Sequence, residues 1–357
     1  MALINLAVRD FRNIAAADLV FSPQLNLITG CNGAGKTSLL EAVYFLGRVQ
    51  SFRTSHPNSL IREGADALLL RGQLLGANGT MASIGVQRDQ KLLQVRMGGR
   101  PVRHLAELIA HFPFQLLTPD SHRLLDGGPR YRRRFLDWGV FHVEPAFFPA
   151  WQRYSRALRQ RNAALRSRLS IREIQLWDNE LIAATEILDT LRRTYLDLLL
   201  PVLMEYIAAL TDMVGLEWEY RTGWGRKLTY DQALLEGLEG DRRQGFTRLG
   251  PHRADLLPTL EGEPAQERIS RGQQKQIAIA LMLAQAAVYR LSTGRASLFL
   301  IDDLASELDM THRSRVLGHL RELDAQIFLT AIEPGSIETQ LWCEARQFHV
   351  EHGRVEE

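Results

Sequence analysis

Hydrophobic and polar positions follow three successive patterns along the chain. In the first 120 residues, short apolar runs typical of strands are separated by glycine-rich turns, and one helix-like stretch occurs at residues 38–46. The last two of these runs predict an antiparallel hairpin. The predicted strands are Leu3–Val8, Asp18–Phe21, Leu25–Thr29, Leu68–Leu75, Met81–Arg88 and Leu92–Met97.

The middle of the chain has a helical pattern. From Pro145 to Met213 the apolar residues recur at roughly helical spacing, and glycine does not occur. This pattern predicts two or three long helices, arranged as an antiparallel hairpin that turns near Ser170.

Strands and helices alternate again after about residue 245. A long helix is expected over Ile269–Leu291, and the apolar run Ser297–Ile301 is typical of a strand at the centre of a buried parallel sheet. Further strands are expected at Ile327–Thr330 and, at an edge, at Gln347–Val350. The sequence therefore predicts an α/β fold, in which a discontinuous core of residues 1–120 and 245–357 carries a mainly α-helical lobe inserted at residues 121–244.

The composition is that of an ordinary soluble globular protein, with 357 residues of which 45% are hydrophobic and 24% charged. No run of about 18 uncharged apolar residues occurs, and the N-terminus lacks the basic segment of a signal peptide. We therefore expect no membrane association. Of the two cysteines, Cys31 lies in a glycine-rich loop that a disulfide would obstruct, which indicates a reducing, cytoplasmic location.

Charge is distributed unevenly within the predicted lobe. The formal net charge of the chain is only +2, which gives no global signal for a polyanionic partner. Residues 121–172 contain 12 arginines against three acidic residues, a net charge of +9. Residues 173–241 contain 14 acidic residues against five basic ones, a net charge of −9. We expect these opposite charges to pair across the helical hairpin.

The most specific chemical motif lies at residues 30–37, which fit the pattern G-x-x-x-x-G-K-[ST] between a predicted strand and a predicted helix. In such a loop the glycines turn backbone N–H groups onto phosphate oxygens, and the helix adds its positive end. Lys36 is expected to reach the β- and γ-phosphates of ATP, and Thr37 to bind Mg²⁺. The predicted nucleotide-binding residues of the motif are Gly30, Cys31, Asn32, Gly33, Ala34, Gly35, Lys36 and Thr37, followed by Ser38.

A second motif is the apolar run Leu298–Ile301 followed by Asp302 and Asp303, which has the form of a Walker B strand. Alone, such a run is more often an ordinary strand end. Together with the phosphate loop it predicts that Asp302 binds Mg²⁺ opposite Thr37. Asp303 is expected to act as general base or to position the attacking water. The predicted catalytic residues are thus Asp303 and Lys36.

The start of the predicted helix at residues 269–291 carries Ser270, Gly272 and Gln273, which offer a second anion-binding nest. A helix N-cap by Ser270 is a compatible alternative. The run Ser270–Gln274 resembles the S-G-G-Q signature of the ABC ATPase superfamily, with Arg271 in place of the first glycine. There the signature of one subunit closes on the nucleotide of the other, which implies an ATP-dependent homodimer with two-fold symmetry.

Three further features bear on this resemblance. Residues 305–309 match the D-loop, which crosses the dimer interface in the superfamily. Gln115 is the candidate for the Q-loop contact to nucleotide and Mg²⁺, and a surface glutamine is equally consistent with its position. Transporter ATPases usually have a histidine where this chain has Thr330, which weakens an alternative function as the energising subunit of an ABC transporter.

Four more motifs occur in order: Arg12-Asn13, Ser51–Thr54, Gly128–Asp137 and Gly250–Leu256. With the signature and Walker B segments they resemble the bacterial RecF family, recombination mediator ATPases related to SMC-family heads, over essentially the whole chain. The resemblance implies an ABC-type P-loop ATPase head with weak Mg²⁺-dependent hydrolysis. It also implies binding to DNA at junctions of single-stranded gaps and duplex. By family resemblance the partners are RecR, RecO and, functionally, RecA.

The candidate DNA-binding residues are arginines: Arg130, Arg132, Arg133, Arg134 and Arg53. Those at 130–134 either contact DNA phosphates or pair with nearby acidic residues at a solvated helix start. Arg53 either links ATP to the DNA surface or is structural, and Arg12 and Asn13 are expected near the nucleotide. A third possible function is a nucleotide-sensing scaffold without useful turnover.

Overall fold

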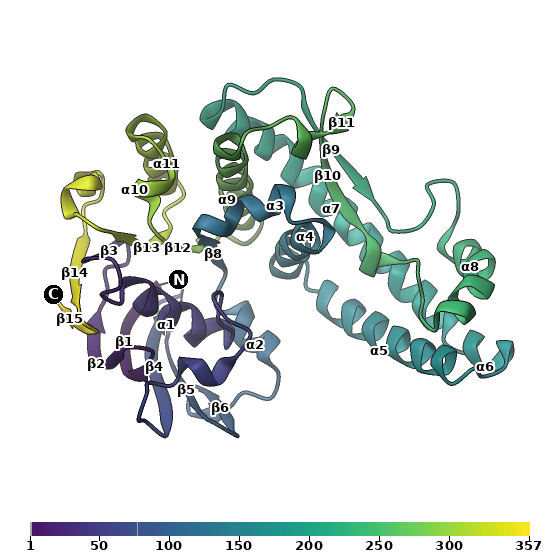
Figure 1. Cartoon of the computed structure of the whole chain (residues 1–357), viewed down its shortest axis with the longest axis horizontal. Coiled ribbons are helices and arrows are strands. Elements are labelled where there is room, and N and C mark those ends of the chain that lie inside the picture. Colours follow the sequence, from purple (N-terminus) through teal and green to yellow (C-terminus); the bar gives the residue numbers. More distant parts are fainter. Residues whose placement is uncertain (1, 77) are drawn as a thin grey trace. The chain divides into compact units, whose positions relative to one another are not determined.

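The computed structural model describes residues 2–76 and 78–357, which form two compact units. The first unit comprises the chain up to Ser121 together with Tyr289–Glu357, and the second comprises His122–Val288 (Figure 1). The first unit is therefore discontinuous in sequence.

The first unit consists of strands and a few helices. Its strands are β1 (Ala2–Phe11), β2 (Ile14–Val20), β3 (Leu25–Thr29), β4 (Ala67–Leu75), β5 (Met81–Asp89), β6 (Leu93–Met97), β7 (Arg100–Pro101), β8 (Phe114–Leu117), β12 (Leu298–Ile301), β13 (Gln326–Ala331), β14 (Ala345–Glu351) and β15 (Arg354–Glu356). Its helices are α1 (Lys36–Arg48), α2 (Leu105–Ala110), α10 (Leu304–Glu307) and α11 (Met310–Glu322).

These strands form two six-stranded sheets. One sheet is antiparallel, in the order β2-β1-β4-β5-β6-β7, and the other has the order β15-β14-β3-β13-β12-β8. In the second sheet the neighbours from β14 to β8 are parallel, and only β15 pairs antiparallel. The carboxyl ends of β3, β12 and β13 therefore meet at one edge, which is where ligands bind in sheets of this kind.

Helix α1 packs into the hydrophobic core that the two sheets share. Its buried Leu39, Val43 and Phe45 belong to one cluster with Leu6 of the antiparallel sheet and Phe328 of the parallel sheet. Burial on both sides explains why α1 is apolar over most of its circumference. The core thus fixes the first turn of α1, and with it the loop that precedes it.

The second unit is mainly helical. Its elements are α3 (Arg123–Asp126), α4 (Pro129–Val143), α5 (Phe147–Arg166), α6 (Ile171–Gln175), α7 (Asp178–Leu210), β9 (Leu216–Arg221), α8 (Tyr230–Gln244), β10 (Asp255–Leu260), β11 (Glu263–Pro264) and most of α9 (Arg271–Thr293).

The predicted helical hairpin is present. Helices α5 and α7 are its arms, and Ser170 caps α6 at the turn in a capping box with Glu173. The opposite charges of the two arms do pair: Arg153 binds Glu180 at 2.6 Å, and the fully buried Arg161 binds Asp178 at 2.7 Å. The uneven charge seen in the sequence is thus partly an internal ion-pair network.

Residues 245–288 group with the helical unit, although their sequence pattern assigned them to the core. The physical reason is strand β10, which pairs antiparallel with β9 and receives the packing of α4. Strand β9 lies in the predicted lobe of residues 121–244, just after the helical pattern ends at Met213, and was not predicted. Within residues 2–76 and 78–357 no helix is both long and apolar enough to cross a bilayer.

Candidate nucleotide site

The loop between β3 and α1 is held by close backbone contacts on two sides. Gly30 has a φ of 144°, and a Cβ there would lie 2.2 Å from the carbonyl oxygen of Val350 in β14. Gly35 has a φ of 124°, and a Cβ there would lie 2.8 Å from Asn13 Nδ2. The backbone N–H of Gly353, after β14, donates to the carbonyl of Ala34 at 2.9 Å. Glycine is therefore required at both loop positions.

Lys36 is folded over this loop. Its Nζ donates to the carbonyl oxygens of Gly30 at 2.7 Å and Cys31 at 3.0 Å, so the ammonium group lies over the concave side of the loop. Because Lys36 is also the first residue of α1, its charge adds to the positive end of the helix. The loop thus presents backbone N–H groups, a helix N-terminus and an ammonium to one anion.

A polar cluster joins the carboxyl ends of β12 and β13 to α1. Thr37 Oγ1 donates to the Asp302 carboxylate, 3.0 Å from Oδ1 and 3.2 Å from Oδ2. Thr330 Oγ1 donates to Asp302 Oδ1 at 2.8 Å and accepts from the backbone N–H of Asp303 at 2.8 Å. Thr330 was noted in the sequence only because it is not a histidine, yet it fixes both acidic residues.

The Thr37–Asp302 pair fits a magnesium site of the nucleotide-dependent kind. Mg²⁺ is held in such sites by one or two protein oxygens together with substrate phosphates and water. Among the described residues no group of three or more His, Cys, Asp or Glu side chains forms a metal cage.

Asp303 has a left-handed backbone, with a φ of 57°, at the N-terminus of α10. This conformation is uncommon for residues other than glycine, although aspartate and asparagine tolerate it best. Asp303 comes two residues after the end of the Walker B strand β12, and it lines the same cavity as Lys36 and Thr37.

These residues surround one cavity of about 970 Å³. Arg12, Asn13 and Arg53 also line this cavity. For Arg12 and Asn13, a position near the nucleotide was expected from the family resemblance. Asn13 Nδ2 donates to the carbonyl of Ala34 at 3.0 Å, which ties the β1–β2 turn to the phosphate loop. The lining includes further residues that the sequence analysis missed: Ser59, Ile61, Arg62, Glu63 and Pro119.

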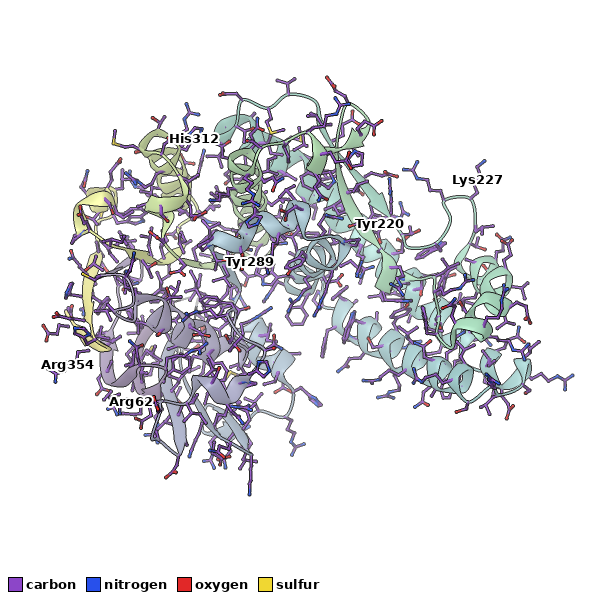
Figure 2. All side chains as sticks on the ribbon, in the orientation of Figure 1. Arg62, Tyr220, Lys227, Tyr289, His312 and Arg354 are labelled. Atoms are coloured by element: carbon purple, nitrogen blue, oxygen red, sulfur yellow. The ribbon has the colours of Figure 1, made fainter. Side chains whose placement is uncertain are left out.

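Most of the missed lining residues lie between α1 and β4, at positions 59–63, after the Ser51–Thr54 motif and outside every motif that the sequence offered. Arg62, on the rim of the cavity, also lines a smaller hollow of about 540 Å³ together with Arg354 of β15. Figure 2 labels both arginines, which lie on the same side of the first unit.

Gln115 is not brought to this cavity. Gln115 lies within β8, paired in register with Phe299, and is 4% exposed, so it is not a surface glutamine either. Its place inside a buried sheet explains why it is not among the lining residues.

The signature residues lie in the second unit. Ser270 precedes α9 and forms a capping box: Ser270 Oγ accepts from the backbone N–H of Gln273 at 3.3 Å, and Gln273 Oε1 accepts from that of Ser270 at 2.8 Å. Ser270 and Gly272 are exposed. The N-cap interpretation is therefore realised, and the helix start remains open to solvent.

The candidate DNA-binding arginines differ in what they contact. Arg130 and Arg134 are exposed on α4. Arg132 is buried and binds Asp255 through two hydrogen bonds of 2.8 and 2.9 Å, and Arg133 donates to the carbonyl of Ala254 at 2.7 Å. The prediction of a DNA contact by Arg132 is therefore corrected, because its guanidinium is turned inward to join α4 to β10. Arg53, in turn, lies at the nucleotide cavity.

We expect Arg132→Ala to lower the free energy of unfolding by about 3–5 kcal/mol, because it leaves the Asp255 carboxylate buried without its partner. Arg134→Ala, an exposed change on the same helix, is expected to alter it by about 0.5 kcal/mol at most. Urea unfolding monitored by circular dichroism measures both. Equal effects of the two variants would contradict the inward role of Arg132.

His252, for which the sequence suggested no role, lies in the interior of the second unit, as Arg132 does. Its ring nitrogens contact the Tyr154 hydroxyl at 2.5 Å and the carbonyl of Thr247 at 3.1 Å. Burial lowers the pKa of His252 to about 4, so the ring is neutral at physiological pH. The Gly250–Leu256 motif is thus explained by packing between α5 and the segment before β10.

Comparison with known proteins agrees with this architecture. The family model described as RecF/RecN/SMC N terminal domain matches residues 2–352. The DNA replication and repair protein RecF of Proteus mirabilis (strain HI4320) is 40% identical over 359 residues, covering 100% of this chain and 99% of that protein. The protein of the same name from Chromohalobacter salexigens is 42% identical over 358 residues, covering 99% of each.

Solved structures show the same fold. The recombination mediator protein RecF with ATP, in the RecFOR pathway, has a TM-score of 0.89 at 24% identity, covering 99% of this chain and 97% of that one. An Smc head bound to the C-winged helix domain of ScpA has a TM-score of 0.60 at 14% identity, covering 100% and 96%.

The two sheets, the phosphate loop between them and the Walker B strand beside it define an ABC-type P-loop head, of the class shared by RecF, RecN and SMC proteins. Within this class, the relatives that match over their whole length at 40% and 42% identity are RecF proteins. The chain belongs to the RecF family of DNA replication and repair proteins.

Proposed function

We propose that this chain is an ATP-gated DNA-binding protein of recombinational repair and replication. The observation that carries the proposal is the convergence of Lys36, Thr37, Asp302 and Asp303 on one cavity. A lysine and a helix N-terminus suit a triphosphate, and a threonine–aspartate pair suits its metal ion. The ATP bound in the related RecF structure supports the same ligand here.

In this proposal each group of the cavity has one task. Lys36 and the loop N–H groups bind the β- and γ-phosphates. Thr37 and Asp302 would hold Mg²⁺, which when bound would neutralise charge on those phosphates. Asp303 orients the attacking water and accepts its proton. Its backbone N–H is fixed by Thr330, so its side chain is placed without help from a histidine. We expect turnover to be weak.

The proposed homodimer rests on the second anion site, at the start of α9. The exposed start of α9, with Ser270 and Gly272, is a helix N-terminus suited to phosphate. We propose that it closes on the nucleotide of a second copy, so that two ATP molecules are enclosed by a two-fold dimer. Hydrolysis then releases the copies from one another and from DNA.

The DNA partner is proposed to be duplex next to a single-stranded gap. Exposed arginines such as Arg130 and Arg134 supply phosphate contacts of the kind that make binding salt-dependent. A related structure belongs to the RecFOR pathway, which supports RecR and RecO as partners. RecA loading as the outcome is proposed on the family resemblance alone. A cytoplasmic location follows from this role.

The test is sedimentation of the chain with ATP and Mg²⁺, with and without short gapped duplex DNA, at two salt concentrations. We expect a shift from monomer to dimer on adding ATP, and salt-sensitive co-sedimentation of DNA with the dimer only. Ser270→Arg is expected to bind ATP with unchanged affinity yet remain monomeric, since a bulky cation blocks the second anion site.

Dimerisation of Ser270→Arg on ATP would contradict the contribution of the signature to the partner's site. Dimerisation of the unmodified chain without DNA binding would favour the scaffold hypothesis, and a phosphate burst without steady hydrolysis would support that further. Membership of the RecF family argues against the transporter alternative.

A further inference from the structure

Glu41 is a buried acid behind the nucleotide cavity. It lies on α1, five residues after Lys36, and its side chain is 0% exposed. The cavity is lined by Arg12 and Arg53, and both of these arginines contact Glu41. No motif in the sequence draws attention to it.

The carboxylate of Glu41 has partners on both oxygens. Oε1 accepts from Arg12 Nη2 at 3.0 Å and from the hydroxyl of Ser51. Oε2 accepts from Arg12 Nε at 2.9 Å and lies 3.7 Å from Arg53 Nη1. The Arg12 contact is a two-point pairing, which fixes the plane of the guanidinium as well as its position.

Ser51 links Glu41 to a third segment, residues 51–54. The Ser51 hydroxyl oxygen accepts from the backbone N–H groups of Arg53 and Thr54, each at 2.9 Å. Glu41 therefore ties together the β1–β2 turn, helix α1 and residues 51–54, all of which border the same cavity.

The two arginines are held with different strength. Arg12 is 20% exposed, and its Nη1 also donates to the carbonyl of Ser59 at 3.1 Å, so it is fixed. Arg53 is 46% exposed, and its distance of 3.7 Å from Glu41 exceeds a hydrogen bond. Arg53 is thus attracted to the carboxylate but is held less firmly than Arg12.

Electrostatics explains why an acid is needed here. The cavity lining carries four cations, including Arg62, and three acids other than Glu41. The two cations that lie beside Glu41 are Arg12 and Arg53, and like charges this close repel. A buried carboxylate is stable only when its partners are well placed, as they are at Glu41. It offsets the repulsion between the two arginines, both of which line the cavity where phosphates are proposed to bind.

We infer that Glu41 is a positioning residue of the nucleotide site, which fixes Arg12 against the phosphates and keeps Arg53 close to them but less firmly held. This inference rests on the proposed binding of ATP. Glu41 acts only through the two arginines, so its contribution to nucleotide affinity disappears when they are removed.

A double-mutant cycle tests this dependence without measuring turnover. The dissociation constant of a fluorescent ATP analogue is measured by titration for the unmodified chain, Glu41→Gln, Arg12→Gln and the double variant. We expect Glu41→Gln to weaken binding about tenfold alone and to add less than about twofold in the Arg12→Gln background. Thermal unfolding without nucleotide reports the stability of each variant separately.

Additive effects of Glu41→Gln and Arg12→Gln on the dissociation constant would overturn the inference. So would a loss of thermal stability in Glu41→Gln with an unchanged dissociation constant, since that describes a purely structural acid. Failure of the unmodified chain to bind the analogue would remove the proposed function first and the inference with it.

A second pair keeps the test valid if Glu41→Gln does not fold. Ser51→Ala removes a single hydroxyl and is expected to weaken binding about two- to fivefold, because residues 51–54 lose their anchor. In the Arg53→Gln background the same change is expected to have no effect on the dissociation constant. An equal effect in both backgrounds would show that Ser51 does not act through Arg53, against the inference.

Discussion

Lys36→Met is expected to abolish nucleotide binding. Lys36 supplies the only ammonium group within the phosphate loop, and its Nζ already lies over the loop carbonyls of Gly30 and Cys31. Methionine has a similar length but no charge, so a charge-assisted contact to the phosphates is lost while the fold of the loop is kept. We expect affinity for ATP to fall on the order of 100-fold, measured by titration of a fluorescent analogue.

A matched control is Lys227→Met, the same chemical change at an exposed position of the second unit, which Figure 2 labels. It is expected to bind ATP like the unmodified chain. Tight binding by Lys36→Met would count against the phosphate loop as the triphosphate site.

Asp303→Asn is expected to separate binding from hydrolysis. Asparagine tolerates the left-handed backbone of residue 303 as well as aspartate does, so the turn after β12 is preserved. It cannot accept a proton from water, and we expect the rate of phosphate release to fall about 10²–10⁴-fold. With ATP binding intact and the reset step blocked, the variant is expected to accumulate as dimer on sedimentation.

Asp324→Asn is the control, because Asp324 also has a left-handed backbone, with a φ of 54°, but lies exposed after α11. Its turnover is expected to match that of the unmodified chain. Normal turnover by Asp303→Asn would show that another residue acts as the general base.

The parts of the site that could be predicted are those in which chemistry is local in sequence. Residues 30–37 join β3 to the first turn of α1, so their placement follows from spacing alone. The placement of Asp302 and Asp303 was predictable for a similar reason, since a wholly apolar run identifies a buried strand and they follow it directly. The strand bounds at Leu25–Thr29 match the structure.

What could not be predicted depends on pairing between distant residues. From the sequence, Arg132 cannot be distinguished from the three other arginines at 130–134. Only the fold places Asp255, 123 positions later in the chain, beside it. Glu41 reads as an ordinary helix residue until Arg12 and Ser51 meet its carboxylate. The grouping of residues 245–288 with the helical unit likewise depends on β9, whose partner β10 lies more than 30 residues further along the chain.

The contacts of the phosphate loop with Val350 and Gly353 have a consequence for synthesis on the ribosome. The loop at residues 30–37 emerges early, but β14 and the turn after it follow more than 300 residues later. At typical elongation rates of about 5–20 residues per second, this delay lasts roughly 15–60 seconds. The nascent chain therefore carries an unfinished phosphate loop for most of its synthesis, and the loop gains its contacts with β14 and the following turn only once residues 345–353 have been added.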